Sequence, residues 1–260
     1  MHDLFDICEY ESETDTSIMP QMPLIGDAAP EFTANTTNGV INFPGDYAGR
    51  WVILFSHPSD FTPVCTSEFM AFQARMDDFR ALNTDLVGLS VGTLTSHIAW
   101  LNAIQNMRFN GWDNIKITFP VIDDTKMHVA KMYGMIHPNA SDTHAVRAVF
   151  IIDTKGVIRA ILYYPASTGR NFDEIMRMLV ALQTADTFKV STPADWMPGE
   201  DVLVSAPSTT DGMRQVLSNG ERGADVHSWF LISKKLDEDT IMSRLHRGGA
   251  SGARGAAKKK

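Results

Sequence analysis

The sequence predicts an α/β fold in which helices cover a central β-sheet. The run WVILFS at residues 51–56 is apolar without alternation, which is typical of a strand buried on both faces of a sheet. Strand-like and helix-like segments alternate through the middle of the chain. A strand hairpin is predicted on either side of this alternating part. Together these three observations favour a sheet with helices packed against it.

The first predicted elements extend from residue 32 to residue 91. Two alternating runs joined at Asn38 and Gly39 predict a hairpin over 32–43, because this residue pair favours a tight primed turn. After the strand at 51–56, apolar residues recur at helical spacing and predict one amphipathic helix that contains Phe69, Phe72, Met76 and Phe79. Residues 85–91 then read as a strand.

The alternation continues to residue 183. A helix is predicted over 95–107, with Thr95 or Ser96 as its cap and with Ile98, Leu101 and Ile104 inside. The remaining predicted elements are a strand end at 119–124, a short helix closed by Gly134, a hairpin over 148–164 that turns at Lys155 and Gly156, and an amphipathic helix at 172–183.

The composition changes near Ala185. Residues 191–204, STPADWMPGEDVLV, read as an extended connector. A short helix at 211–217, a strand at 229–233 and a helix at 237–247 follow. We therefore predict four parts: an acidic flexible arm (1–19), a main domain (20–185), a small C-terminal domain (186–246) and a Gly/Ala/Lys flexible tail (247–260). The second domain is so small that it is expected to lean on a partner surface.

Charge and composition exclude several classes of protein. The 260 residues carry a formal net charge of −8, whereas a nucleic-acid-binding face usually shows a basic excess. The apolar runs are far shorter than a membrane span, and no secretory signal is visible at the N-terminus. Two cysteines far apart in sequence do not indicate a disulfide framework, so we expect a cytoplasmic protein.

Cys65 is the residue that most requires explanation. It follows a turn-rich loop that contains Pro58 and Pro63, and it lies where a helix is predicted to begin. A helix N-terminus stabilises a thiolate, which is the nucleophilic form of cysteine. The hydroxyl group of Thr62 is within reach of the same point, and a positive charge could come from Arg147 or Arg170. The pattern therefore predicts a reactive thiol in an electropositive pocket.

Pro58, Thr62 and Cys65 form P-x-x-x-T-x-x-C, which resembles the active-site signature of peroxiredoxins. The longer string SHPSDFTPVCTSE is similar to the one-cysteine subgroup, which includes mammalian peroxiredoxin 6 and archaeal thioredoxin peroxidases. The resemblance covers residues 24–204 through the landmarks GDAAPEF, IHPNASDT, VRAVFIID, YPASTGRN and TPADWMPGEDV. It continues more loosely through SWFLISKKL.

The resemblance implies a thioredoxin-like fold with a small C-terminal α+β dimerisation domain. It implies a thiol-dependent peroxidase that reduces hydrogen peroxide and organic hydroperoxides through a sulfenic acid on Cys65. The implied roles of the other residues are activation by Thr62 and Arg147, shielding of the pocket by Pro58, pairing of Glu68 with Arg147, and a surrounding shell that contains His57 and Arg170. No cofactor or metal is expected. The expected partners are an external thiol reductant of the thioredoxin or glutathione type and further copies of the chain, as a homodimer and in rings of dimers.

Three other functions compete with a peroxidase. GLSVG at residues 88–92 matches the G-x-S-x-G elbow of serine hydrolases, but Ser90 and Val91 continue a predicted strand instead of forming a sharp turn. A disulfide oxidoreductase would require C-x-x-C, whereas residues 65–68 read CTSE. A non-enzymatic holdase that binds unfolded chains stays open as a second role, and it would survive substitution of Cys65.

The second cysteine raises the question of what reduces oxidised Cys65. Some archaeal relatives use a cysteine in the C-terminal domain, but residues 224–233 contain none. The only other thiol is Cys8, and the neighbouring acidic residues Asp6, Glu9 and Glu11 disfavour its thiolate form. We expect a one-cysteine cycle with an external thiol, and a cycle resolved by Cys8 is the alternative.

Overall fold

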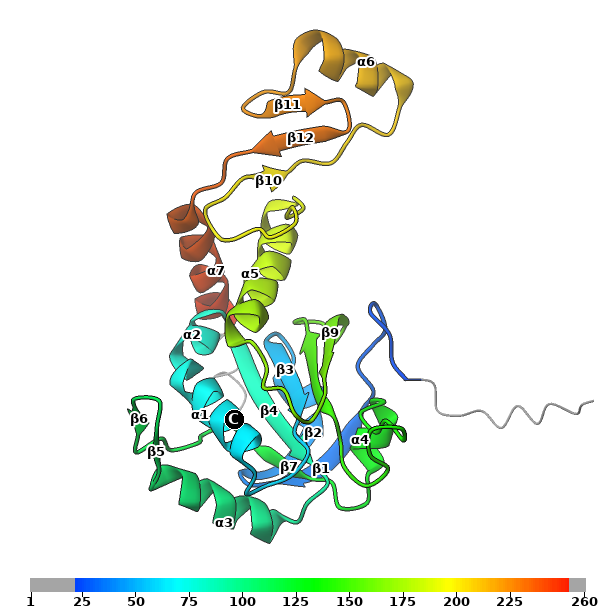
Figure 1. Cartoon of the computed structure of the whole chain (residues 1–260). Helices are drawn as coiled ribbons and strands as arrows, with labels where there is room; N and C mark the ends of the chain where they lie inside the picture. Colours follow the sequence, from blue (N-terminus) through cyan, green and yellow to red (C-terminus); the bar gives the residue numbers. More distant parts are fainter. Residues whose placement is uncertain (1–21, 253–260) are drawn as a thin grey trace, which may run out of the picture.

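The computed structural model describes residues 22–252, with side chains to residue 246, and its centre is a seven-stranded mixed sheet (Figure 1). The strand order is β2-β1-β7-β4-β3-β8-β9. The bounds are β1 Phe32–Thr36, β2 Gly39–Phe43, β3 Trp51–Ser56, β4 Thr84–Ser90, β7 Val121–Asp123, β8 Arg147–Ile152 and β9 Ile158–Tyr164. Two predicted hairpins are confirmed, because β1 pairs with β2 and β8 pairs with β9 in antiparallel register.

The strand predicted to be buried on both faces lies inside the sheet. β3 pairs with β4 in parallel and with β8 in antiparallel register, and all six of its residues are buried. Its side chains alternate between two apolar cores, with Ile53 and Phe55 on one face and Val52 and Leu54 on the other. This arrangement explains why the run shows no polar alternation.

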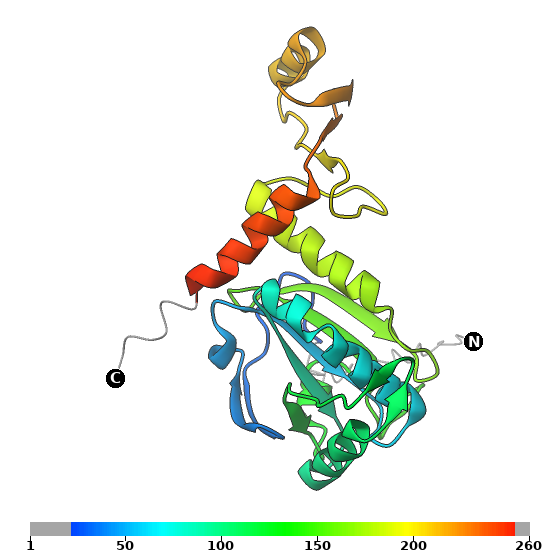
Figure 2. The ribbon, with the colours of Figure 1, turned by 90° about the vertical axis from the view of Figure 1, so that its left-hand side faces the viewer.

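Helices cover both faces of the sheet, which confirms the predicted α/β class (Figure 2). One core contains residues of α1, α2, α3, α5 and α7, and the other contains residues of α4 and the β1–β2 hairpin. The bounds are α1 Pro63–Ala74, α2 Met76–Ala81, α3 Leu94–Gln105, α4 His128–Met132 and α5 Phe172–Phe188. A single 3-10 turn, Gly45–Tyr47, and a small hairpin of β5 (Arg108–Phe109) and β6 (Trp112–Asp113) complete this part.

Three details of the sequence-based prediction are wrong. The helix after Cys65 is interrupted at Arg75, so the predicted face is divided between α1 and α2. The cap of α3 is Thr93, whose hydroxyl oxygen accepts a hydrogen bond from the Ser96 amide at 3.2 Å. Ile98 is 45% exposed, because the face of α3 that packs on the sheet is centred instead on His97, Trp100 and Ile104.

The C-terminal part leaves the main body and then returns to it. β10 (Val202–Leu203), β12 (Leu231–Lys234) and β11 (Asp225–Ser228) form a three-stranded antiparallel sheet, accompanied by α6 (Thr210–Asn219). Figures 1 and 2 show this unit projecting away from the large sheet, while α7 (Glu238–Gly252) runs back beside α5.

The structure describes part of one predicted terminal segment and none of the other. α7 continues to Gly252, whereas the sequence predicted that this helix ends at residue 247 and that a flexible tail follows. The predicted acidic arm and Cys8 lie outside the described residues. No helix within residues 22–252 is both long and apolar enough to cross a membrane.

Candidate active site

Cys65 lies in the first turn of α1, as the sequence predicted. Thr62 is the N-cap residue in an extended conformation, and Pro63 is the first helical residue. Proline suits this position because its ring presets the helical φ and because the missing N–H has no partner there anyway. Cys65 has a relative exposure of 0%, so the sulfur sits in the protein interior at the positive end of the helix.

Arg147 reaches Cys65 from the first residue of β8. Its Nη1 donates to the Cys65 sulfur at 3.3 Å and to Oε2 of Glu68 at 2.7 Å. Nε and Nη2 both donate to the carbonyl oxygen of Ala166, at 3.2 and 2.7 Å. The guanidinium group is thus held on two sides, and one of its hydrogen atoms remains directed at the sulfur.

Glu68 joins Arg147 to a second buried arginine. The backbone N–H and Nε of Arg170 donate to Oε1 of Glu68, both at 2.9 Å, and its Nη2 donates to Oε2 at 2.6 Å. The Nη1 group of Arg170 donates to the carbonyl oxygens of Ser56 and Ala148. Every polar group of Glu68 and Arg170 therefore has a partner in the interior.

The charges of this arginine cluster, defined as Glu68, Arg147 and Arg170, do not cancel. Two guanidinium groups face one carboxylate, and all three side chains are at most 2% exposed. A net positive charge buried in this way is costly without a further anion. The sulfur of Cys65 lies at hydrogen-bond distance from this excess positive charge.

The Thr62 hydroxyl group donates a hydrogen bond within its own loop. Its Oγ1 hydrogen is directed to the carbonyl oxygen of Ser59 at 2.9 Å. The lone pairs of this hydroxyl oxygen can therefore accept a hydrogen bond from a molecule that enters the site. Pro58 and Thr62 are half-buried at the two ends of the loop that connects β3 to α1.

His57 is buried directly after the end of β3. Its Nε2 lies 2.9 Å from Oδ1 of Asp60, while its Nδ1 has no hydrogen-bond partner. Burial lowers the pKa of His57 despite the nearby carboxylate, so the ring is neutral at pH 7. Asp60, Ser96, His97 and Ala166 were not assigned any role from the sequence. The histidine and aspartate residues at these positions match no recognised sequence motif.

Ser90 does not form a hydrolase elbow. It is the last residue of β4, is 1% exposed, and its Oγ has no hydrogen-bond partner. The following helix starts only at Leu94. The nearby His97 uses Nε2 to bond the carbonyl oxygen of Ile122 at 3.1 Å, so no base is directed at Ser90. Residues 22–252 also contain no group of three or more acidic, histidine or cysteine side chains that could hold a metal ion.

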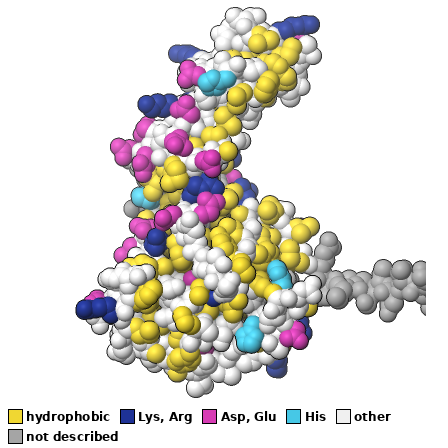
Figure 3. All heavy atoms as spheres, viewed as in Figure 1, with side chains coloured by type: hydrophobic (Ala, Val, Ile, Leu, Met, Phe, Trp, Pro, Cys, Tyr) yellow, Lys and Arg dark blue, Asp and Glu magenta, His cyan; other side chains and the backbone are white. Residues whose placement is uncertain are grey.

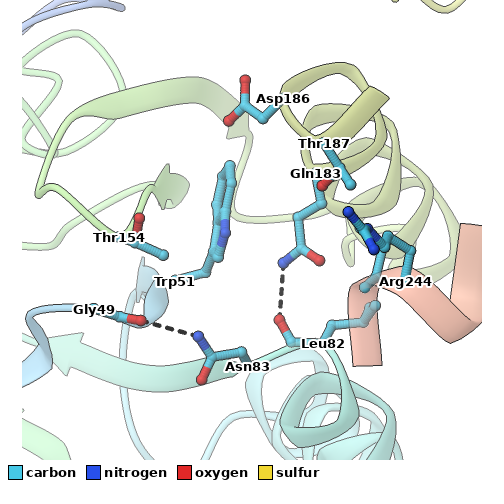
Figure 4. A pocket seen from close by; sticks show the side chains of 10 residues that line it. Gly49, Trp51, Leu82, Asn83, Thr154, Gln183, Asp186, Thr187 and Arg244 are labelled. Atoms are coloured by element: carbon cyan, nitrogen blue, oxygen red, sulfur yellow. Dashed lines mark hydrogen bonds between the residues drawn. The ribbon is translucent and has the colours of Figure 1, made fainter. Parts of the chain in front are cut away.

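Neither of two surface pockets has Cys65 among its lining residues, although the second is lined by Thr62 and Val64 beside it. A pocket of about 320 Å³ lies beside the start of β3, at the end opposite to Cys65. Figure 4 shows that the side chains of Gln183 and Asn83 in this pocket form hydrogen bonds with backbone carbonyl groups. A more apolar pocket of about 550 Å³ lies along α1 and α3, where Phe61, Trp100, Met107 and Phe109 line it. Neither pocket contains the arginine cluster.

Comparison with known proteins gives a consistent result. Residues 25–161 match the model of the AhpC/TSA family, and residues 181–219 match the C-terminal domain of 1-Cys peroxiredoxin. A peroxiredoxin of Methanosarcina mazei is 56% identical over 215 residues, which cover 82% of this chain and 98% of the relative. A peroxiredoxin of Aquifex aeolicus is 47% identical over 225 residues, covering 83% of this chain and 98% of the relative.

Solved structures agree with these sequence matches. The yeast mitochondrial 1-Cys peroxiredoxin superposes with a TM-score of 0.72 and 36% identity, covering 83% of this chain and all of the other. A cysteine-to-serine mutant of peroxiredoxin 6 from Arenicola marina gives a TM-score of 0.69 and 30% identity, covering 82% of this chain and 99% of the other.

Proposed function

Since this chain belongs to the AhpC/TSA family of peroxiredoxins, which are thiol-dependent peroxidases, we propose that Cys65 is its peroxidatic cysteine. The observation that supports this most directly is the 3.3 Å contact between Arg147 and the Cys65 sulfur, inside a cluster with excess positive charge. No other cysteine occurs in residues 22–252. The thioredoxin-like fold with its added C-terminal domain matches this family.

The proposed chemistry uses three groups of the site. The Cys65 thiolate attacks the terminal oxygen of a hydroperoxide, the O–O bond breaks, and the sulfur becomes a sulfenic acid while an alkoxide or hydroxide leaves. The leaving oxygen then takes up a proton and departs as alcohol or water. Arg147 stabilises the negative charge that develops on the oxygens, and Thr62 accepts a hydrogen bond that orients the peroxide. Glu68 and Arg170 hold Arg147 in place, and Pro58 shields the sulfur.

We propose hydrogen peroxide and organic hydroperoxides as substrates and an external thiol as reductant. A one-cysteine cycle is supported by the match to the 1-Cys C-terminal domain and by the lack of a second cysteine within residues 22–252. For the yeast mitochondrial 1-Cys peroxiredoxin, thiol resolving proceeds via glutathione and thioredoxin systems. Reductants of these two types are therefore the first to test here.

The decisive experiment is peroxide consumption with dithiothreitol as reductant. Cys65→Ser should abolish the activity, while the matched control Cys8→Ser should retain it. After one equivalent of peroxide, intact mass should show one added oxygen per chain. Loss of two hydrogens per chain in wild type, absent in Cys8→Ser, would instead identify Cys8 as the resolving residue.

We also propose that the protein is a homodimer built through its C-terminal part and that dimers associate further into rings. Hydrophobic side chains lie at the surface along the projecting unit (Figure 3). The large apolar residues that are exposed in this unit include Leu217, Trp229, Phe230 and Leu231. An exposed apolar surface of this kind is typical of a protein interface. Sedimentation velocity should show a dimer or larger species, and Phe230→Asp should shift the distribution towards smaller species.

A further inference from the structure

A second buried polar cluster lies beside the active-site loop, and the proposed chemistry does not use it. The carboxylate of Asp60 is its centre. Oδ1 of Asp60 is 2.9 Å from Nε2 of His57, and Oδ2 is 2.8 Å from Nδ1 of His97 and 2.6 Å from Oγ of Ser96. Both imidazole side chains are 0% exposed and that of Asp60 is 5% exposed. We call these four residues the Asp60 cluster.

The ring of His97 is held from both sides. It faces an acceptor with each ring nitrogen: Nδ1 faces Asp60, and Nε2 lies 3.1 Å from the carbonyl oxygen of Ile122. The contact with Asp60 therefore joins the buried carboxylate to a ring that is itself anchored to β7. His57 has an acceptor at Nε2 alone and is the neutral tautomer.

The surroundings of Asp60 favour the ionised form of its carboxyl group. Burial on its own raises the pKa of Asp60, but hydrogen bonds from His57, His97 and Ser96 together hold that pKa well below its ordinary value. Contacts from two histidines and one serine therefore fix the position of this carboxylate in the interior.

The cluster connects the active-site loop to two other elements. Asp60 lies two residues after Pro58 and two residues before Thr62, in the loop between β3 and α1. Ser96 and His97 belong to the first turns of α3, and His97 is anchored in turn to β7 through Ile122. Among the hydrogen bonds of the described residues, only Asp60 links residues 58–62 to α3.

The loop itself needs such an anchor. Phe61 has a φ of +55°, a left-handed conformation that is unfavourable for a bulky side chain. Phe61 is also 61% exposed, so its own side chain has little packing to hold that conformation. The adjacent Asp60 carboxylate anchors this strained segment to His57, Ser96 and His97, in addition to the hydrogen bond between Thr62 and Ser59 within the loop.

We propose that Asp60 and His97 are positioning residues, which hold the loop so that Pro58 and Thr62 stand correctly over Cys65 for the approach of the peroxide. This inference rests on the proposed function of Cys65. It predicts a specific defect: loss of the contact between Asp60 and His97 should slow the reaction with peroxide, which needs Thr62, but not alkylation, which needs only the Cys65 sulfur. Arg147, which contacts that sulfur, and its partner Glu68 lie outside the Asp60 cluster.

The test compares two rates in a Cys8→Ser background of the full chain. Stopped-flow oxidation by hydrogen peroxide and alkylation by iodoacetamide are measured for Asp60→Asn, His97→Gln, the double variant and Ser96→Ala. The two single variants should lose about 10- to 100-fold in the peroxide rate, because small displacements of a positioned group cost rates of this order. Their alkylation rates should change less than about threefold. The double variant should be no slower than the slower single variant, since the pair acts as one unit.

Ser96→Ala is the matched control. It removes one hydrogen bond to the same carboxylate oxygen but leaves the contact between Asp60 and His97 intact, so both rates should stay within about threefold of wild type. A loss in Ser96→Ala as large as that in Asp60→Asn would overturn the role of the contact between Asp60 and His97. A parallel fall of both rates in Asp60→Asn and His97→Gln would also overturn the proposal, as would folded variants with unchanged peroxide rates.

A milder substitution decides the question if those variants do not fold. Asp60→Glu keeps the charge but moves the carboxylate by one methylene, and it should lower the ratio of peroxide rate to alkylation rate about 3- to 10-fold. An unchanged ratio in folded Asp60→Glu would refute the positioning role. Failure of the proposed function is distinguishable, because wild type itself would then show no peroxide reaction that depends on Cys65.

Discussion

The loop between β3 and α1 lies between two buried ionic clusters that differ in charge balance. The arginine cluster places two guanidinium groups around Glu68 and has excess positive charge beside Cys65. The Asp60 cluster is centred on one carboxylate, which two histidines and a serine contact. The arginine cluster directs a guanidinium N–H at the sulfur of Cys65, whereas the contacts of the Asp60 carboxylate hold the loop to α3. The difference indicates that the arginine cluster provides reactivity and the Asp60 cluster provides geometry.

The largest expected effect is on the stability of the arginine cluster. Glu68→Gln removes the only carboxylate between Arg147 and Arg170, which leaves two buried cations facing each other. Breaking a buried pair in this way should lower the free energy of unfolding by about 3 to 5 kcal/mol. Urea unfolding of both proteins measures this loss. A change below about 1 kcal/mol would mean that the two arginines are neutralised by some other group.

Arg147→Lys should affect rate more than stability. Lysine keeps the charge but cannot contact Ala166, Glu68 and Cys65 at the same time, as the forked guanidinium does. We expect the peroxide rate constant to fall by about 10- to 1,000-fold, with a decrease of only a few degrees in Tm.

The matched control is Arg159→Lys. Arg159 lies on the edge strand β9 and donates from two nitrogens to Asp186, which lines the pocket at the far end of β3 from Cys65. This substitution should leave the peroxide rate unchanged. Equal losses of activity and stability in Arg147→Lys would show that Arg147 is mainly structural.

Acid should lower the stability of the fold through the Asp60 cluster. Burial lowers the pKa of His57 below its unfolded value of about 6.5. The unfolded chain therefore takes up a proton first, and stability that is fully present above pH 6.5 is lost as the pH falls below it. Asp60 stays ionised over this range because its pKa is lowered too, and its own contribution is lost only in stronger acid.

The measurement is the free energy of unfolding between pH 7 and pH 5. His57 should contribute a slope of up to about 1.4 kcal/mol per pH unit. His57→Gln should reduce the slope by that contribution. An identical slope in wild type and His57→Gln would show that His57 is not neutral in the folded protein.

The smallest effect is expected for an ion pair at the surface. Glu174 and Arg177 form the same type of carboxylate–guanidinium contact as Glu68 and Arg170, but their side chains are 34% and 21% exposed. Glu174→Gln should cost less than about 1 kcal/mol, because water replaces the lost interaction. If its cost equalled that of Glu68→Gln, burial would not be the factor that separates the two pairs.

The sequence by itself determined the local structure around the site. Asn38 and Gly39 specify a turn, the unbroken apolar run at 51–56 specifies a central strand, and Pro63 after Thr62 specifies where α1 begins. These features depend on backbone preferences and on burial of neighbouring residues, so they can be read from short segments. The placement of Cys65 at a helix start follows from them. The likeness to a known family added the pairing of Glu68 with Arg147.

Only the tertiary structure decided which distant side chains share the interior. Glu68 and Arg170 are 102 residues apart, and Asp60 and His97 are 37 residues apart. No periodicity connects such residues, because their contacts depend on the order of strands in the sheet and on the packing of α3 against it. The same packing moved the buried face of α3 to His97 and left Ile98 exposed. A buried charge needs a partner wherever the fold places one, and that place is set by the whole chain.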